Sequence, residues 1–327
     1  MGGGYYRTPG GPMTQLPLFP GSDTDVPHPS STTLGIYAGH WIETVSAPPM
    51  VAPYTQANRR QMLRRYILPV FGEALIGSVT RRDAIEFQRS LFALGFKIRT
   101  VRNIVLSCLG PMLSEAYRDG LVGQVATRGL RWPREDPEWP ESYNRRDRDR
   151  ILRWFERYGP RYVPYVALIF LAGLRPSEAA GVQTGDVDFA RGIVSIRRAV
   201  VNRKVGKTKT KKSVRDLYVT TRLLAILRAH RDPDARPGDF LVPSRRGGPL
   251  HTNGFTTYWW HRCLADLGIE RRGPRAGRHH FATAAVRHAS YQDVAEYMGN
   301  SPVILRRHYV GRSGVLRSPL RREKSKR

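Results

Sequence analysis

The segment from Arg275 to Tyr309 reads R-A-G-R-H-H-F-A-T-A-A-V-R-H-A-S-Y-Q-D-V-A-E-Y-M-G-N-S-P-V-I-L-R-R-H-Y and decides the fold. Arg278 begins an apolar pattern with the period of an α-helix. The apolar side chains stand three, four, seven and eight residues after it, at Phe281, Ala282, Ala285 and Val286. We therefore predict that Arg278 opens a helix whose apolar stripe packs behind it.

Two further helix starts follow in the same segment. Ser290 with Asp293 three residues later has the pattern of a capping box, and Gly299 is a residue that ends helices. Ser301 and the proline after it predict one more helix start. This last helix would carry Tyr309. Taken alone, a tyrosine directly after a histidine is more typical of packing than of chemistry.

A second stretch, L-A-G-L-R-P-S-E from Leu171 to Glu178, supplies the other half of a predicted phosphate site. Arg175 precedes a proline at a first helical position, where free N–H groups and the helix dipole attract anions. Glu178 would fix the arginine by an ion pair. Arg175 and Arg278 together would form a two-arginine clamp on phosphate.

Charge is the outlying feature of the composition. The 327 residues include 54 Lys and Arg against 27 Asp and Glu, a formal net charge of +27. Such an excess points to a polyanionic partner, most often nucleic acid. An anionic membrane surface and the arginine bias of a GC-rich genome are the alternatives. The 40% hydrophobic share suits two globular domains.

Cysteine content and apolar runs limit the class of protein further. Cys108 and Cys263 are the two cysteines, so we expect neither a disulfide framework nor a cysteine zinc site. The first residues lack the pattern of a signal peptide. The run from Val166 to Gly173 is far shorter than the roughly 20 residues that span a bilayer. These features predict a cytoplasmic protein without membrane contact.

Composition and pattern divide the chain into five parts. Residues 1–33 are rich in Gly, Pro, Ser and Thr and predict a flexible tail. Residues 34–130 predict a helical domain, and the proline-rich residues 131–143 a linker. A second domain would span residues 144–310. Residues 311–327 are predominantly basic and predict a mobile tail.

The first two helices of the helical domain follow from caps and apolar spacing. One begins after Thr32 or Thr33 and carries one apolar face, made by Leu34, Tyr37, Ala38, Trp41, Ile42 and Val45. Thr55 is predicted to cap the second. We expect this helix to stop before Pro69, because proline disrupts a helix interior.

The next two helices complete the predicted helical domain. Thr80 with Asp83 resembles a capping box and opens the third helix, which Gly95 closes. Thr100 is predicted to open the fourth. An apolar stripe continues along it past Pro111, which should kink the helix.

The second domain shows a helical, a β-like and again a helical part. The helix Ile151–Tyr158 is followed by a nearly all-apolar helix over Pro164–Leu171, which we expect to be buried. Residues 193–219 predict two or three strands around a cationic hairpin, Arg203–Lys212. Helices resume near Asn253, with one face made by Phe255, Tyr258, Trp259 and Cys263.

The order and spacing of these segments are similar to those of the tyrosine recombinase (phage integrase) family. The matching segments are L-A-G-L-R-P-S-E, then K-T-K-K-S-V-R at Lys209–Arg215, then R-H-H-F-A-T, then G-N-S-P and H-Y. Tyr309 stands nine residues after Asn300, as the family's nucleophile does after its histidine. Residues 34–120 resemble its core-binding domain, especially at Ile67–Gly72 and Ala116–Leu121.

The resemblance implies a fold that is mainly α-helical with a small antiparallel β-sheet. A helical core-binding domain would precede a mixed α/β catalytic domain of the DNA breaking–rejoining type. The partners it implies are double-stranded DNA and three further copies of the chain, in a homotetramer in which each protomer clamps DNA. Accessory DNA-bending or directionality factors are further possible partners, and the resemblance implies no cofactor and no metal.

The resemblance also assigns site residues. Arg175 and Arg278 match the two family arginines that hold the phosphate, and Glu178 the acid that supports the first. Tyr309 matches the nucleophile that forms a covalent 3′-phosphotyrosyl link. Lys209 matches the general acid, although Lys207 or Lys211 could take that role in so basic a hairpin.

Two positions depart from the family pattern. Arg275 stands where the family has histidine, and Asn300 where it has histidine or tryptophan. Both can donate to phosphate, but neither offers a neutral imidazole that accepts a proton. His279 matches a family histidine with a structural role, and with His280 and His308 it could compensate. A zinc site from these histidines is not expected, since no metal motif accompanies them.

Three functions fit these observations. The first is a site-specific recombinase that integrates or excises a mobile element without ATP. The second is a DNA-binding protein of the same fold, impaired in catalysis by Arg275 and Asn300. The third is a general nucleic-acid-binding protein whose segments match by accident.

Overall fold

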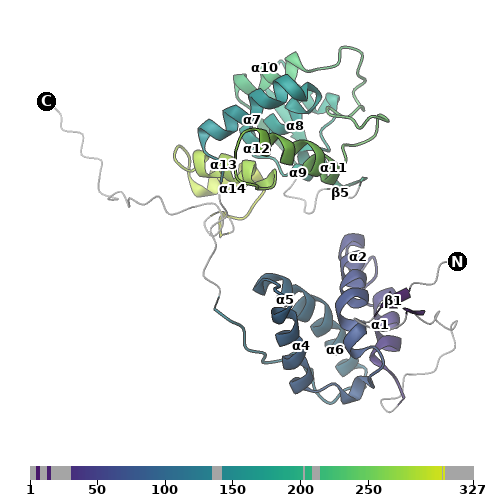
Figure 1. Cartoon of the computed structure of the whole chain (residues 1–327). Coiled ribbons are helices and arrows are strands. Elements are labelled where there is room, and N and C mark those ends of the chain that lie inside the picture. Colours follow the sequence, from purple (N-terminus) through teal and green to yellow (C-terminus); the bar gives the residue numbers. More distant parts are fainter. Residues whose placement is uncertain are drawn as a thin grey trace. The chain divides into compact units, whose positions relative to one another are not determined.

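The computed structural model describes residues 5–7, 13–15, 31–134, 142–201, 203–207, 214–303 and 305. The chain divides into two compact units, residues 1–136 and 137–327, which Figure 1 shows in the colours of the sequence. The division falls within the segment predicted as a linker. The finer limits of the tails and the linker stay predictions.

The first unit is a helical bundle. Its α-helices are α1 (Leu34–Glu43), α2 (Pro53–Met62), α3 (Leu68–Phe71), α4 (Arg81–Ala93), α5 (Ile98–Ile104) and α6 (Gly110–Arg118). Between them lie two π-helical turns, η1 (Leu63–Ile67) and η3 (Val105–Leu109), and a 3₁₀ turn, η2 (Ile76–Ser78). Two short antiparallel strands, β1 (Tyr5–Arg7) and β2 (Met13–Gln15), lie within the segment predicted as a tail.

Local capping signals predicted two helix starts in this unit. The Thr33 hydroxyl accepts a hydrogen bond from the Ile36 N–H at 3.3 Å and caps α1. The Thr80 hydroxyl and the Asp83 carboxylate form a reciprocal capping box at the start of α4. Both predictions are confirmed, and Gly95 adopts the positive φ of 79° after α4.

The second helix differs from its prediction at both ends. It is Pro53 that lies in its first turn, so Thr55 is already helical and caps nothing. The chain also remains helical through Pro69, because the π-turn η1 precedes α3. This places the proline in the first turn of α3, where a missing N–H is tolerated.

The fourth helix begins earlier than predicted and is not regular. Lys97 is its cap, so Thr100 lies in its first turn. The π-turn η3 interrupts the helix just before Pro111, which lies in the first turn of α6. The apolar stripe nevertheless packs as predicted, and Ile104, Cys108 and Met112 are buried in the core of the unit.

The second unit combines helices with two small antiparallel sheets. Its helices are α7 (Arg145–Tyr158), α8 (Val163–Leu171), α9 (Pro176–Ala179), α10 (Thr221–Ala229), α11 (Thr252–Phe255), α12 (His261–Asp266), α13 (Arg275–Ala285) and α14 (Tyr291–Met298). One sheet has the order β3 (Val187–Asp188), β4 (Ile193–Ile196), β7 (Arg215–Tyr218), and the other pairs β5 (Arg198–Val201) with β6 (Lys204–Lys207). The predicted class, mainly α with a small antiparallel sheet, is confirmed.

Helix α8 forms the centre of this unit. Eight of its nine residues are buried, as an apolar pattern on all sides predicts. Helices α7, α9, α10 and α13 all contact it. Gly277 of α13 faces Ile169 and Phe170, and an added Cβ would lie about 3.0–3.1 Å from them. The absence of a side chain at Gly277 thus lets α13 approach α8 closely, next to Arg278.

Three helical predictions for this unit need correction. Helix α7 begins at Arg145, six residues before the predicted Ile151, because Asn144 caps it. Helix α10 was not predicted, although Thr220 caps it and Leu223 and Leu227 are buried. Helix α13 begins at Arg275, so Arg278 lies one turn inside it and does not open it.

The aromatic face predicted near Asn253 is correct only in part. Phe255 and Cys263 are buried, but Tyr258 is 74% exposed. The reason is the π-turn η7 (Thr256–Trp260), which adds a residue to the turn and shifts the helical phase. Trp260 is buried in its place. Throughout the described ranges every helix is too short or too polar to cross a bilayer.

Candidate functional site

Arg175 is placed by a sharp turn after the buried helix α8. Gly173 has a φ of 64°, and a Cβ there would collide with the ring of Phe281. Glycine is therefore required for α13 to pack against this turn. Arg175 then caps α9, with its backbone N–H donating to Glu178 Oε2 at 3.0 Å. Its Nη1 donates to Glu178 Oε1, as the predicted ion pair requires.

Glu178 is the centre of a cluster of three arginines. Its side chain is 3% exposed, and besides Arg175 it pairs with Arg215 Nη2 at 3.1 Å and with Arg278 Nη1 at 3.8 Å. Burial alone would raise the pKa of Glu178. The charges of Arg215, Arg175 and Arg278 outweigh burial and hold the pKa below its usual value. One carboxylate therefore faces three guanidinium groups, which leaves an excess of positive charge.

The same three arginines cap the C-terminus of helix α14. Arg215 Nε donates to the carbonyl of Tyr297 at 2.7 Å, Arg278 Nη2 to that of Met298 at 2.8 Å, and Arg175 Nη2 to that of Gly299 at 2.7 Å. The last carbonyl groups of a helix lack intrahelical donors and carry partial negative charge. The arginines satisfy three of these groups in succession.

A left-handed turn ends α14 and presents Asn300. Gly299 has a φ of 65°, and the N–H of Asn300 donates to the carbonyl of Ala295 at 2.8 Å, as in a Schellman motif. The Asn300 side chain accepts a hydrogen bond from Arg175 Nη2 at 2.7 Å through Oδ1. Its Nδ2 is buried and has no hydrogen-bond partner among the described residues. The side chain that replaces the family's histidine or tryptophan therefore lies directly beside Arg175.

The three arginines differ in access to solvent. The side chain of Arg278 is 1% exposed and that of Arg215 is 9% exposed, whereas that of Arg175 is 31% exposed. Arg278 also donates to the carbonyl of Gly173 at 2.6 Å. An anion that approaches from solvent would therefore meet Arg175 first. The deeper arginines add positive charge behind it and fix the groups around it.

The remaining predicted site residues lie in different places. Arg275 is exposed on the first turn of α13, whereas His279 is half-buried. His280 is buried, with its Nδ1 2.6 Å from the carbonyl of Tyr143, and burial lowers its pKa. Such an environment indicates a structural histidine. Lys209, Tyr309, His308 and Lys211 lie outside the described residues, as does the side chain of Lys207.

The residue that sequence reasoning missed is Arg215. In the sequence it stands at the end of the basic segment that starts at Lys209. A usable signal existed, because side chains alternate along a strand and Arg215 precedes the buried Leu217 by two positions. An arginine on the buried face of a strand needs a buried acceptor, and Glu178 and the Tyr297 carbonyl provide it.

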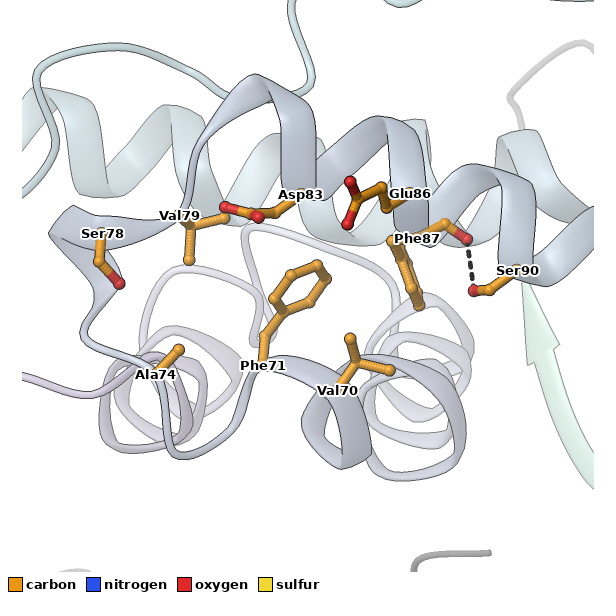
Figure 2. Close-up of a pocket in the computed structure, with 9 residues that line it drawn as sticks. All are labelled: Val70, Phe71, Ala74, Ser78, Val79, Asp83, Glu86, Phe87 and Ser90. Atoms are coloured by element: carbon orange, nitrogen blue, oxygen red, sulfur yellow. Dashed lines mark hydrogen bonds between the residues drawn. The ribbon is translucent and has the colours of Figure 1, made fainter.

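A hollow in the helical unit has the opposite charge. It has a volume of about 570 Å³ and lies between the α3–η2 region and α4 (Figure 2). Apolar side chains line it together with the carboxylates of Asp83 and Glu86. Asp83 is bound to the Thr80 cap, and Glu86 pairs with Arg82. The negative charges of the two carboxylates would repel a phosphate group. This hollow is therefore no alternative to the arginine cluster as a phosphate-binding site.

Two regions of the sequence match family models, and two curated proteins are similar to the chain. Residues 149–312 match the model of the phage integrase family, and residues 33–92 match its N-terminal SAM-like domain. The tyrosine recombinase XerD of Pseudomonas aeruginosa is 25% identical over 261 residues, 77% of this chain and 84% of that protein. The tyrosine recombinase XerA of Pyrococcus furiosus is 28% identical over 209 residues, 63% of this chain and 67% of that protein.

Solved structures of integrases share the fold. The Tn1549 transposon integrase, in complex with a circular intermediate DNA, matches with a TM-score of 0.73 at 17% identity, over 86% of this chain and 96% of that chain. A lambda integrase dimer bound to a core site matches with a TM-score of 0.70 at 14% identity, over 88% and 80%. With the family model covering half of the sequence, including the arginine cluster, the chain belongs to the phage integrase family of tyrosine recombinases.

Proposed function

We propose that this protein is a site-specific DNA recombinase that cuts and rejoins DNA through a covalent 3′-phosphotyrosyl intermediate at Tyr309. The observation that carries the proposal is the cluster of Arg175, Arg215 and Arg278 around the single carboxylate of Glu178. A surplus of fixed guanidinium charge suits the transition state of phosphoryl transfer, in which negative charge builds on the non-bridging oxygens.

Each step of the proposed reaction has a residue assigned to it. Arg175, the most exposed of the three arginines, would bind a non-bridging oxygen of the scissile phosphate. Arg278 would stabilise the negative charge that builds on the same phosphate. It could do so from its buried position, or after its hydrogen bond to the carbonyl of Met298 in α14 is released. The Tyr309 oxygen would attack phosphorus, and Lys209 would protonate the leaving 5′-oxygen. The covalent link conserves the energy of the phosphodiester, so rejoining would require neither ATP nor metal.

The biological role follows by analogy with the relatives. The Tn1549 transposon integrase is seen in complex with a circular intermediate DNA, and lambda integrase is seen as a dimer on a core site and as a tetramer on a Holliday junction. We therefore propose integration or excision of a mobile element by a homotetramer on double-stranded DNA. Accessory DNA-bending or directionality factors would set the direction, and the protein would act in the cytoplasm.

A catalytically impaired DNA-binding protein is the second candidate, and two observations favour it. Asn300 is bound to Arg175 through its amide and lacks an imidazole. Arg275 is exposed and permanently charged. Neither residue can accept the tyrosine proton. Such a protein would bind DNA with a steep dependence on salt and leave it intact.

A trapping experiment separates the two candidates. The full chain is incubated with nicked duplexes made from the DNA that flanks its own gene, then denatured, and covalent protein–DNA adducts are measured on gels. The recombinase predicts an adduct that maps to Tyr309 and disappears in Tyr309→Phe. DNA binding that depends steeply on salt, without any covalent adduct, would reject the recombinase function and favour the catalytically impaired DNA-binding protein.

A further inference from the structure

Arg215 belongs to the arginine cluster, but no step of the reaction described above is assigned to it. It is the first residue of β7, opposite Ile196 of β4, and stands six residues after Lys209 in the sequence. Its guanidinium group spans two elements: Nη2 bonds Glu178 of α9 at 3.1 Å, and Nε bonds the carbonyl of Tyr297 in α14 at 2.7 Å. It therefore joins β7 to α9 and α14, the two helices between which the arginine cluster lies.

The guanidinium of Arg215 also lies against the turn that ends α14. A Cβ built on Gly299 would stand 3.0 Å from Arg215 Nη1 and 3.3 Å from its Cζ. The next residue, Asn300, is the one that touches Arg175. The position of Asn300 therefore depends on a turn that packs directly on Arg215.

The depth of Arg215 argues against direct contact with DNA. Its side chain is 9% exposed, compared with 31% for Arg175, and the two donors described above are directed at protein acceptors. Glu178 Oε2 accepts from Arg215 Nη2 and from the Arg175 backbone N–H, and Oε1 accepts from Arg175 Nη1. Arg215 thus acts on the cluster through Glu178, and on Asn300 through the α14 turn.

We propose that Arg215 is a positioning residue for phosphoryl transfer, which holds Arg175 and Asn300 in the geometry that the scissile phosphate requires. The inference rests on the proposed recombinase function. A misplacement of about 1 Å can lower a rate by about 100-fold, so loss of Arg215 should slow cleavage strongly without weakening DNA binding.

The test compares Arg215→Met and Arg215→Lys with a matched control, Arg198→Met. Arg198 also pairs with a carboxylate, that of Asp186, whose side chain is 10% exposed, and donates to the carbonyl of Gly181. Within the described ranges none of its hydrogen bonds or ion pairs reaches α14. We expect DNA affinity within about twofold of wild type for all three variants. Adduct formation should fall by about 100-fold in Arg215→Met and by about tenfold in Arg215→Lys, which keeps the charge but not the two-sided contact. Arg198→Met should cleave at the wild-type rate per folded molecule.

A neutral substrate tests whether Arg215 acts through Arg175. In a methylphosphonate one charged non-bridging oxygen is replaced by a methyl group, so an arginine that binds this charge loses its importance. We expect the defect of Arg175→Ala to shrink relative to wild type on one methylphosphonate stereoisomer, and the defect of Arg215→Met to shrink on the same stereoisomer, because Arg215 acts through Arg175. A wild-type rate in Arg215→Met, an equal defect in Arg198→Met, or rescue of Arg215→Met on the opposite stereoisomer alone would each overturn the proposal.

Hydrogen exchange tests the same proposal without any chemistry on DNA. The amides of Gly299 and Asn300 donate to the carbonyl groups of Glu296 and Ala295, and they report on the turn. Arg215→Met should speed their exchange at least tenfold, and Arg198→Met should not. Unchanged exchange in Arg215→Met would contradict the positioning role. If wild type formed no adduct but the exchange result held, the recombinase function would fail while the role of Arg215 at the turn would stand.

Discussion

Removing the charge of Glu178 should destabilise the second unit more than any exposed ion pair could. In Glu178→Gln, the buried side chains of Arg215 and Arg278 lose the carboxylate that pairs with them. Breaking a buried pair from one side costs about 3–5 kcal/mol. We expect about 3 kcal/mol, the lower end of that range, because Gln keeps one oxygen acceptor and the partly exposed Arg175 regains hydration.

The assay is urea unfolding of the full chain, followed by the fluorescence of the tryptophans, over a range of pH. A loss of about 3 kcal/mol would lower the melting temperature of a unit of this size by about 6–12 °C. The control is Glu43→Gln in the helical unit, whose carboxylate pairs with Arg60 at 2.7 Å but is 50% exposed. That variant should lose less than about 1 kcal/mol.

The pH dependence has a definite sign. The pKa of Glu178 is lower in the folded protein than its ordinary value of 4.5. The ion pairs of Glu178 therefore contribute their full stabilisation above about pH 4.5, the pKa of this carboxyl in the unfolded chain. This stabilisation is lost as the pH falls through the lower pKa of the folded protein. The gap between wild type and Glu178→Gln should be constant from pH 6 to 8 and shrink below pH 4.5. A gap under 1 kcal/mol at pH 7, or one that persists unchanged in acid, would refute the reasoning.

Three further predictions concern α14 and the departures from the family pattern. Gly299→Ala should cost about 2 kcal/mol in urea unfolding, because it strains the left-handed turn and crowds Arg215, whereas Gly247→Ala, with equally positive φ but open space, should cost about 1 kcal/mol. Ser290→Ala should cost about 1 kcal/mol by removing the α14 cap, and a loss below 0.3 kcal/mol would contradict that role. Arg275→His restores a proton acceptor and should speed adduct formation at pH 7 at least about tenfold; no gain in a single-turnover assay would show that proton transfer is supplied elsewhere.

Local chemistry predicted the parts of the fold that depend on neighbouring residues in the chain. The capping box at Thr80, the Ser290 cap and the glycine after α14 lie where expected, since a cap needs only the three or four residues around it. The burial of α8 followed from its composition alone. Arg175 and Glu178 were paired correctly because they are three residues apart on one short helix.

The parts that the sequence did not predict depend on contacts between distant segments. The π-turn η7 exposes Tyr258 and buries Trp260. The extra residue that a π-turn adds to the helix cannot be predicted from local helix propensity. The role of Arg215 depends on acceptors 37 and 82 residues away, at Glu178 and Tyr297. Helix α10 is a different case, because the sequence does carry a local signal for it: Thr220 caps the helix, and Leu223 and Leu227 stand four residues apart on its buried face.

The three-arginine cap on α14 also bears on how the protein is made. Its hydrogen bonds join residues 124, 82 and 20 positions apart, so the cluster has high contact order and cannot form from any one stretch of chain. A partly unfolded chain would carry the tyrosine and the three arginines without bringing the guanidinium groups together. Under the proposed function, the capacity to cut DNA would therefore arise only at the end of folding, which protects the cell's DNA from incomplete copies of the enzyme.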